Sequence, residues 1–486
     1  MARLFLSHSS ANNAAALALN SWLAEQGFDD VFLDVDPLGG IAPGERWQDA
    51  LRAAADRCEA VLCLLSRAWL ASQWCQAEFQ LAKSLHKRIF GLIVEPVAHD
   101  KIPAEMTAEW QLCDLTGKDE SRSFEVIVKD KPARVSFPLA GLALLRRGLE
   151  RAGLDASSFP WPPPDDPDRA PYRGLSALEA NDAAIFFGRD AAIVRGLDSI
   201  RGMLDKGVER TLVILGASGS GKSSFLRAGL WPRLARADTT FLPLRVIRPG
   251  IAAITGNTGL AGSLAAAFAN LGGSLTRTRI MALLSEGDDP LGALLDELLV
   301  LAKRRLVGVE AGAAGPAIVI PIDQAEELFN ADGAAEATPF FSLLTRAFRS
   351  EAGLRRRLLI IATMRSDSYE MLQSSQQLTE VKRSLFDLPP ISPSEFKGVI
   401  EGPVRVLARA GRDFEIDPAL TEHLIAESQG ADALPLLAFT LERLYADHGH
   451  TGRLTLEDYD QIGGVKGSIE AAVDRALDDP DRAPTI

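Results

Sequence analysis

The sequence predicts an α/β protein with two parallel-sheet domains followed by a helical segment. Two regions alternate short apolar runs with helix-like segments, a proline-rich stretch separates them, and strand signals become rare after residue 392. Strand–helix alternation of this kind favours a parallel sheet covered by helices on both faces. The length of 486 residues suggests roughly three domains.

The first region, residues 1–155, contains four apolar runs that predict strands. They are separated by segments with helical character, and a long loop rich in glycine and proline follows the second run. The predicted strands are residues 3–6, 31–33, 60–65 and 89–94, and the predicted helices are 11–26, 45–56 and 73–85. This order predicts a doubly wound parallel sheet.

Five prolines lie between residues 160 and 167. Proline is excluded from helix interiors and central strands, so we interpret residues 156–170 as an extended linker. Residues 171–390 are then predicted to form a second α/β domain, with a helix over 191–205 and strands over 211–215, 317–322 and 358–362. Residues 391–486 are predicted to form a helical domain.

Composition excludes several classes of partner. The net charge of −13 argues against nucleic acid and against an anionic membrane surface as the main partner. No apolar run approaches the ~18 residues of a membrane span, and the first residues do not resemble a secretion signal. We therefore expect a cytoplasmic protein. The four cysteines and six histidines have no metal-site spacing, so we expect reduced thiols.

The strand over residues 211–215 leads into Gly-x-x-x-x-Gly-Lys-Ser, a P-loop that runs from Gly216 to Ser223. Glycines allow backbone N–H groups to approach phosphate, and the following helix start adds a favourable dipole. Lys222 is expected to reach the β- and γ-phosphates, and Ser223 is expected to bind Mg²⁺. The other predicted contacts to ATP or ADP are Gly216, Ser218, Gly219, Ser220, Gly221 and Ser224.

Asp323 follows the buried strand over residues 317–322 and is the predicted carboxylate of the Mg²⁺ site. Gln324 occupies the position where many P-loop ATPases have a second acid. Glu326 or Glu327 could activate water instead, or the pair could be a solvated helix start. Arg365, beyond the strand over 358–362, is either a sensor of the γ-phosphate or a surface arginine.

Several separated motifs in this region resemble a bacterial STAND-class signalling NTPase. They are Phe186-Phe187-Gly188-Arg189-Asp190, the P-loop with Ser224-Phe225, Asp323-Gln324-Ala325-Glu326-Glu327, Met364-Arg365-Ser366-Asp367, Ala433-Leu434-Pro435 and Gly463-Gly464-Val465. The resemblance implies that Arg189 lies near the nucleotide and that Pro435 closes over the base. It also implies a switch in which ADP holds a closed form and ATP permits oligomerisation. In such proteins a C-terminal repeat domain senses the trigger. We therefore expect either that the given sequence is a fragment of a longer chain or that the sensor lies elsewhere.

In the first region Trp74 and Glu78 are four residues apart on a predicted helix, so they share one face. An aromatic ring beside a carboxylate suits glycosidic cleavage, which passes through an oxocarbenium-like transition state. An ordinary helix face would look the same on spacing alone.

The first region also contains three separated motifs. They are Phe5-Leu6-Ser7-His8-Ser9, the loop Leu38 to Trp47 with Pro43-Gly44-Glu45, and Ser72-x-Trp74-Cys75-x-x-Glu78-Phe79. With these motifs the region resembles a TIR domain, which implies a flavodoxin-like fold with a parallel sheet. In catalytic TIR domains the matching glutamate cleaves NAD to nicotinamide and ADP-ribose or its cyclic form. The resemblance therefore implies Glu78 as the catalytic residue, with Trp74, Ser7, His8 and the loop over residues 36–44 around the NAD. Other TIR domains only recruit partners by self-association.

Together these resemblances suggest an antiviral immune protein in which a nucleotide switch clusters TIR domains. We expect a homo-oligomer formed through both domains, an unknown trigger such as a phage protein, and NAD cleavage as the output. A non-catalytic adaptor and an enzyme that makes a cyclic messenger remain alternatives. With Gln324 in place of a second acid, ATP hydrolysis is expected to be slow.

Overall fold

The computed structural model describes residues 4–28, 31–33, 58–109, 112–117, 120–152, 154, 159–207, 210–250, 252–305, 315–329, 334–349, 356–374, 382–428, 430, 433–465 and 467. The chain divides into two compact units, which are described separately. The first comprises Met1–Ser158 and Asp190–Lys206, and the second comprises Phe159–Arg189 and Gly207–Ile486.

The first unit contains a five-stranded sheet of order β2-β1-β3-β4-β5 in which every pairing is parallel. Its strands are β1 (Leu4–Ser7), β2 (Val31–Phe32), β3 (Ala60–Leu65), β4 (Arg88–Ile93) and β5 (Cys113–Asp114). Its helices are α1 (Asn13–Glu25), α3 (Arg67–Ala71), α4 (Gln73–Ser84), α5 (Ala104–Glu109) and α6 (Leu139–Arg151). The predicted doubly wound sheet is confirmed, whereas the predicted helix over 45–56 lies outside the described residues.

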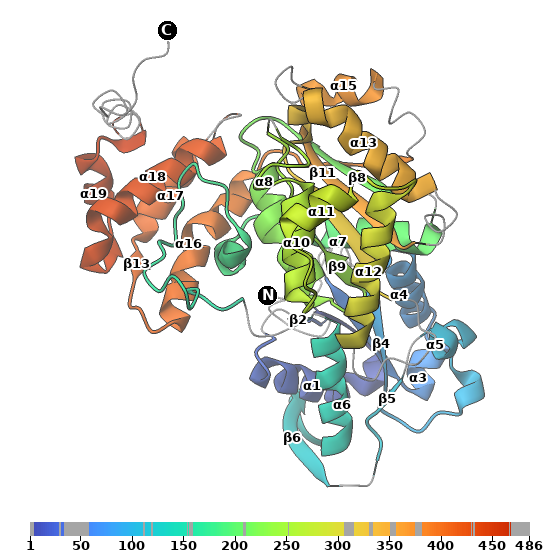
Figure 1. Cartoon of the computed structure of the whole chain (residues 1–486). Helices are drawn as coiled ribbons and strands as arrows, with labels where there is room; N and C mark the ends of the chain where they lie inside the picture. The colour runs from blue at the N-terminus through green and yellow to red at the C-terminus, as the bar shows by residue number, and fades with distance from the viewer. Residues whose placement is uncertain are drawn as a thin grey trace. The chain divides into compact units, whose positions relative to one another are not determined.

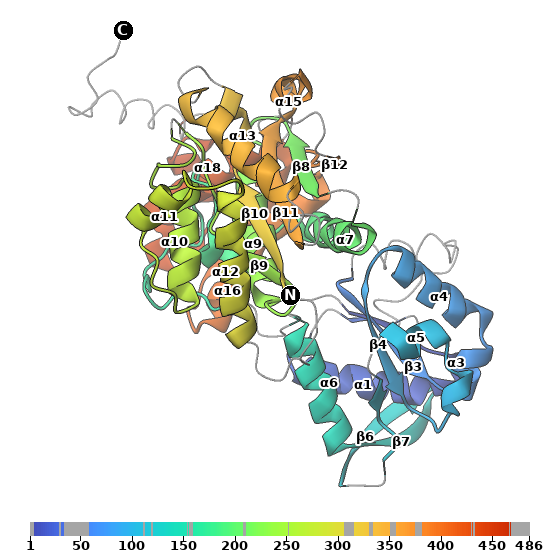
Figure 2. The same cartoon turned by 45° about the vertical axis from the view of Figure 1, so that its right-hand side comes forward.

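Alternation along β3 places its side chains in two different cores. Leu62 and Leu64 pack with residues of α1 and α6, whereas Val61, Cys63 and Leu65 pack with residues of α3, α4 and α5. Figure 2 shows these two groups of helices on opposite sides of the sheet. A two-sided core explains why β3 is an uninterrupted apolar run.

An antiparallel hairpin follows this sheet and was not predicted from the sequence. Its strands are β6 (Ser121–Val128) and β7 (Lys131–Pro138), joined through Lys129 and Asp130, both at positive φ. One face supplies Phe124, Val126 and Phe137 to the core beside α1 and α6. The other face carries mostly polar side chains but also Ile127, which is 71% exposed.

Helix α7 (Asp190–Lys206) belongs to the first unit by its contacts, although the chain on both sides of it belongs to the second. Lys87, just before β4, donates hydrogen bonds to the carbonyl of Cys58 at 2.9 Å and to Asp198 of α7 at 2.5 Å. Arg201 also binds Asp198, at 3.0 Å. Burial, followed by the charge of Arg201, lowers the pKa of nearby Arg88 to about 9. The apolar pattern over 191–205 predicts the helix but cannot predict these partners.

The second unit contains another all-parallel sheet, of order β12-β8-β11-β10-β9. Its strands are β8 (Thr211–Gly216), β9 (Phe241–Pro243), β10 (Ala317–Ile322), β11 (Leu358–Arg365) and β12 (Arg383–Asp387). One face is covered by α10 (Leu260–Asn270), α11 (Arg277–Leu283), α12 (Pro290–Arg305) and α13 (Ala334–Arg349), which share one core with β10 and β11. Figure 1 shows these helices beside the sheet. The predicted P-loop α/β core is confirmed.

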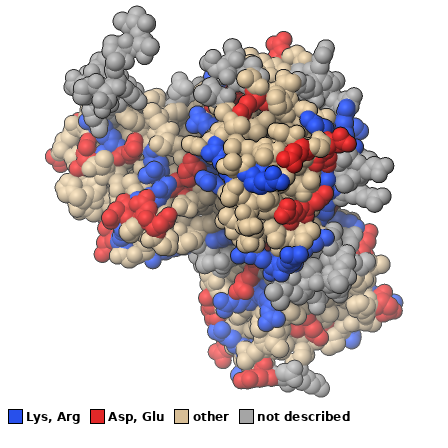
Figure 3. Space-filling view, viewed as in Figure 1, with Lys and Arg blue, Asp and Glu red and all other residues tan. Residues whose placement is uncertain are grey.

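The end of the described chain is mainly helical, as predicted. Its helices are α16 (Pro393–Arg409), α17 (Pro418–Glu427), α18 (Ala433–His448) and α19 (Leu456–Gln461). The two-residue strands β13 (Glu415–Ile416) and β14 (Arg453–Leu454) lie between helices and pair with each other. Their buried side chains form a separate core that also includes Tyr172. On the face drawn in Figure 3, basic and acidic side chains are interspersed among uncharged ones.

Candidate nucleotide site and candidate carboxylate site

The P-loop has the local geometry that its sequence predicts. β8 ends at Gly216, and helix α8 (Lys222–Ser224) begins directly after the loop. Gly219 and Gly221 have φ values of +74° and +82°, which is the left-handed region that a side chain disfavours. The helix continues through a π-helical turn, η4 (Phe225–Leu230), into α9 (Trp231–Arg236).

Lys222 lies across the P-loop. Its ammonium donates to the carbonyls of Gly216 at 2.9 Å and Ala217 at 2.7 Å. Burial lowers the pKa of Lys222, and the nearby acidic groups, Glu326 first among them, act in the opposite direction. The loop therefore holds a half-buried cation at the position where a bound phosphate requires one.

Asp323 is fully buried at the end of β10, where three side chains contact it. The hydroxyls of Ser223 and Thr363 donate to Oδ1 at 2.9 and 2.6 Å. Arg227 of η4 forms an ion pair with Oδ2 at 2.7 Å. The structure thus brings the predicted pair Ser223 and Asp323 together, and their oxygen atoms match the ligands that Mg²⁺ prefers. Thr363 and Arg227 were not predicted as their partners.

Arg189 is buried and joins two segments next to the loop. Its guanidinium donates to the carbonyl of Ser220 at 2.7 Å and to the carbonyl of Pro389 at 2.6 Å. Pro435 of α18 also lies at the P-loop, because a Cβ added to Gly219 would be only 2.8 Å from its Cγ. Arg189 and Pro435, which are more than 200 positions apart in the sequence, therefore both lie at the P-loop.

Arg365 is the register partner of Gly216 in the pairing of β11 with β8. Its guanidinium is exposed and binds Asp367 with two hydrogen bonds of 3.1 and 2.6 Å. Arg365 therefore lies at the first residue of the P-loop, on the sheet edge where phosphate would bind.

The two candidate water-activating acids have different surroundings. Glu327 accepts a 2.8 Å hydrogen bond from the backbone N–H of Gly250 and lies 3.5 Å from Arg248. Glu326 instead lies in the electrostatic environment of Lys222. Burial raises the pKa of Glu326, and backbone hydrogen bonds together with Lys222 act against this shift.

Gln324 has a strained backbone, with a φ of +56°. Its N–H donates to the Thr363 hydroxyl at 2.9 Å, so Thr363 contacts both Gln324 and Asp323. Strain of this kind persists where surrounding contacts impose it and is common at functional sites. Thr363 is a polar residue within the otherwise apolar buried run of β11, and this could have indicated it in the sequence.

In the first unit, Glu78 of α4 lies beside the end of β1. The buried Ser7 hydroxyl donates to its Oε2 at 2.5 Å. Trp74, one turn earlier on α4, is 59% exposed to solvent. The buried Cys63 thiol lies close by, since burial and then the charge of Glu78 raise its pKa. A half-buried carboxylate and an exposed aromatic ring thus lie in the first half of α4.

His8 follows Ser7 and is also buried. Its Nε2 lies 3.2 Å from Oδ1 of Asn13 in α1. The remaining predicted contacts, in the loop over residues 36–44, lie outside the described residues.

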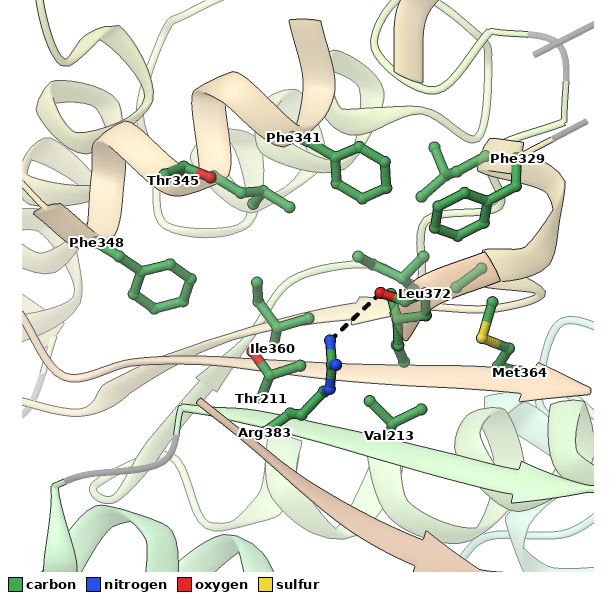
Figure 4. Close-up of a pocket in the computed structure, with 15 residues that line it drawn as sticks. Thr211, Val213, Phe329, Phe341, Thr345, Phe348, Ile360, Met364, Leu372 and Arg383 are labelled. Atoms are coloured by element: carbon green, nitrogen blue, oxygen red, sulfur yellow. Dashed lines mark hydrogen bonds between the residues drawn. The ribbon is translucent and has the colours of Figure 1, made fainter. Parts of the chain in front are cut away.

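The second unit also contains a cavity of about 50 Å³ between the sheet and α13. Figure 4 shows Phe341 and Phe348 of α13 facing Ile360 and Val213 of the sheet, with Arg383 at one side. Arg383 donates to the carbonyl of Leu372 at 3.5 Å and is the charged residue among the described lining side chains. The cavity is apolar and shares no residue with the predicted phosphate contacts.

Over the described ranges, no helix has the length and apolarity needed to cross a bilayer.

Three solved structures are similar to parts of this chain, with low sequence identities and low TM-scores. The TIR domain of a Toll-related receptor from Hydra magnipapillata has 12% identity and a TM-score of 0.21, and the match covers 24% of this chain and 84% of that chain. The ADP form of Aeropyrum pernix ORC2 has 15% identity and a TM-score of 0.41, covering 59% and 69%. A Thermotoga maritima RuvB variant has 16% identity and a TM-score of 0.31, covering 59% and 70%. The comparison with curated proteins gave no match.

Two family models match the chain in the order of its motifs. The TIR domain model matches residues 4–128, which contain Ser7, Trp74 and Glu78. The model described as novel STAND NTPase 1 matches residues 171–484, which contain the P-loop, Asp323 and Pro435. The chain therefore belongs to the novel STAND NTPase 1 family and has a TIR domain on the N-terminal side of its NTPase.

Proposed function

We propose that this protein is a nucleotide-controlled signalling enzyme whose TIR domain cleaves NAD to nicotinamide and ADP-ribose, in linear or cyclic form. The observation that carries the proposal is the Glu78 carboxylate, held by Ser7 beside the exposed ring of Trp74. A carboxylate next to a flat aromatic surface suits a substrate that has a planar ring and forms a cation during reaction.

In the proposed reaction the bond between C1′ of the ribose and the nicotinamide nitrogen breaks. The bonding electrons leave with the nitrogen, which removes the positive charge of the pyridinium ring. Positive charge then develops at C1′ and O4′, where the Glu78 carboxylate stabilises it. Water adds its oxygen to C1′ and releases one proton, or a nitrogen of the adenine adds instead and gives the cyclic product.

The second unit supplies the control element in this proposal. Lys222 binds the phosphates of ATP or ADP together with the other P-loop residues, and Arg365 contacts the γ-phosphate. Ser223 and Asp323 would hold Mg²⁺, which neutralises phosphate charge when it is bound. Arg189 and Pro435 complete the nucleotide site, since both already contact the loop.

We assign water activation for ATP hydrolysis to Glu326. It lies near Lys222, whereas Glu327 is bonded to Gly250. The site has Gln324 where a second acid is common, so we expect turnover below about 1 per second, which suits a switch. ATP binding would then favour a homo-oligomer that assembles the TIR sites in the cytoplasm, with a phage protein as the trigger to test first.

Purified protein incubated with NAD, with and without ATP and Mg²⁺, tests this proposal. Nicotinamide should appear with ATP and Mg²⁺ once the protein oligomerises, and chromatography of the second product distinguishes linear from cyclic ADP-ribose. If the oligomer binds NAD or a partner protein without releasing nicotinamide, the TIR domain acts as a scaffold and the enzymatic proposal is wrong.

A further inference from the structure

The hydroxyl of Ser7 lies between two other side chains at the carboxyl end of β1. It donates to Oε2 of Glu78 at 2.5 Å and accepts from the indole N–H of Trp69 at 3.0 Å. Ser7 and Trp69 are both completely buried, with exposed fractions of 0%. Three elements, β1, α3 and α4, therefore meet through one chain of hydrogen bonds.

The direction of this chain follows from the chemistry of its members. An indole N–H can only donate, so the Ser7 oxygen is the acceptor from Trp69. The single proton of the Ser7 hydroxyl then points to Glu78, which accepts as a carboxylate. A hydroxyl that accepts one hydrogen bond is polarised toward donating another, which strengthens its bond to the carboxylate.

Both ends of the chain are held in place by other contacts. Ser66 caps α3 by accepting from the backbone N–H of Trp69 at 3.0 Å, and its hydroxyl donates to Asn12 at 2.6 Å. The Trp69 ring meets Phe79 edge to face at 6.5 Å between centroids. Phe79 directly follows Glu78, so the same packing fixes both the donor ring and the helix that carries the carboxylate.

We propose that Ser7 and Trp69 are positioning residues for Glu78, an inference that rests on the proposed NAD cleavage. The chain of hydrogen bonds from Trp69 through Ser7 to Glu78, here called the relay, restrains the rotation of the Glu78 carboxyl group. It also stabilises the ionised form of this carboxyl group in a half-buried site. Ser7 accordingly acts through Glu78 and does not bind NAD directly, because its whole side chain is buried. Trp74, exposed on the same helix, contacts the substrate instead.

The test uses the full chain, forced into an oligomer by a fused coiled coil, with kcat and KM measured for nicotinamide release. Ser7→Ala removes both hydrogen bonds of the Ser7 hydroxyl, Trp69→Phe removes only the one from the indole N–H, and Ser7→Thr keeps the hydroxyl. We expect Ser7→Ala to lower kcat by about 10- to 100-fold with KM within about twofold, because misplacing a reacting group costs rates of this order. Trp69→Phe should lower kcat less, and Ser7→Thr should recover part of the loss.

Matched controls remove similar groups elsewhere in the same unit. Ser10→Ala deletes an exposed hydroxyl near Ser7, and Trp22→Phe shortens a buried tryptophan on the opposite face of the sheet. Both should keep wild-type kcat and KM. A raised KM at unchanged kcat in Ser7→Ala would show direct substrate contact and overturn the relay, as would wild-type kinetics in both Ser7→Ala and Trp69→Phe.

A readout without turnover separates this inference from the proposed function. Carbodiimide coupling of Glu78 to glycine ethyl ester, followed by peptide mass spectrometry, should proceed faster in Ser7→Ala and Trp69→Phe than in the wild type. If the wild-type oligomer releases no nicotinamide, the proposed function fails, and the coupling rates still decide whether the relay holds Glu78. Equal coupling rates in all variants would refute the relay even if NAD is cleaved.

Discussion

The Lys87 ammonium donates a hydrogen bond of 2.5 Å to Asp198, although 111 positions separate the two residues in the chain. Lys87 is 1% and Asp198 12% exposed at the side chain, so the pair is shielded from water. It joins α7 to the start of β4 inside the first unit. An intact buried ion pair changes the free energy of unfolding little. Removing one partner lowers the free energy of unfolding strongly, because the other charge stays buried without its partner.

We therefore expect Lys87→Met to destabilise the first unit by about 3 kcal/mol, since it leaves the Asp198 carboxylate buried with Arg201 as a remaining cation. The double variant Lys87→Met, Asp198→Leu should lose less than the sum of the two single variants. Calorimetric unfolding of all four proteins measures the coupling. Strict additivity would mean that the two residues do not depend on each other.

The Lys222 ammonium is half-buried on the P-loop carbonyls, so it is placed for phosphate. Lys222→Ala should weaken ATP binding by about 10- to 100-fold, because it deletes a charge-assisted hydrogen bond to phosphate. Lys397→Ala, on the exposed side of α16, is the matched control and should bind ATP like the wild type. Titration with a fluorescent ATP analogue provides the measurement, and equal affinities in all three proteins would contradict the proposed nucleotide site.

Glu326 and Glu327 should differ in their effect on ATP turnover. Glu326→Gln should lower the rate by about 100-fold, as expected for loss of a general base, whereas Glu327→Gln should change it only a few-fold. Burial raises the pKa of Glu326, so the wild-type rate should increase with pH over a range above the ordinary glutamate value of 4.5. If the rate of Glu326→Gln increases with pH over the same range, a group other than Glu326 causes the increase.

Burial raises the pKa of the Cys58 thiol to about 12 from its ordinary value of 9.0. The neutral thiol is favoured in the folded protein, so below pH 9 the thiol is protonated in both states and its contribution to stability does not change with pH. Above pH 9 the unfolded thiol ionises first and binds fewer protons than the folded one. The free energy of unfolding should then fall by about 1.4 kcal/mol per pH unit.

The comparison of Cys58→Ala with the wild type isolates this group. The variant should lose stability less steeply between pH 9 and pH 11, as followed by urea unfolding of the first unit. Identical slopes for the two proteins would mean that Cys58 is accessible to water in the folded state.

Local patterns in the sequence predict the parts of the structure that depend on neighbours along the chain. The P-loop is an apolar strand, a glycine-rich loop and a helix start within about a dozen residues, and it forms as predicted. β3 and β10 are uninterrupted apolar runs because both of their faces are buried. The family motifs add Arg189 and Pro435, whose contacts with the P-loop agree with the resemblance.

What the sequence does not predict depends on tertiary contacts. The ion pair of Arg227 with Asp323 joins residues 96 positions apart by their numbering, and no periodicity marks it. The different surroundings of Glu326 and Glu327 depend on the loop at Gly250, whose backbone N–H donates to Glu327. The hairpin β6–β7 joins the first unit through its inner face, which packs in the core beside α1 and α6. The partners of α7 lie in a different region of the sequence.

The proposed NAD cleavage depends most directly on Glu78, and one measurement tests the role of this residue. Full-length protein and its Glu78→Gln variant, each forced into an oligomer and supplied with ATP, Mg²⁺ and NAD, should differ by at least about 100-fold in nicotinamide release. The variant should still bind ATP like the wild type, since Glu78 lies in the first unit and the P-loop in the second. Equal release from the two proteins, or no release from the wild-type oligomer, would contradict the assignment of Glu78 as the residue that cleaves NAD.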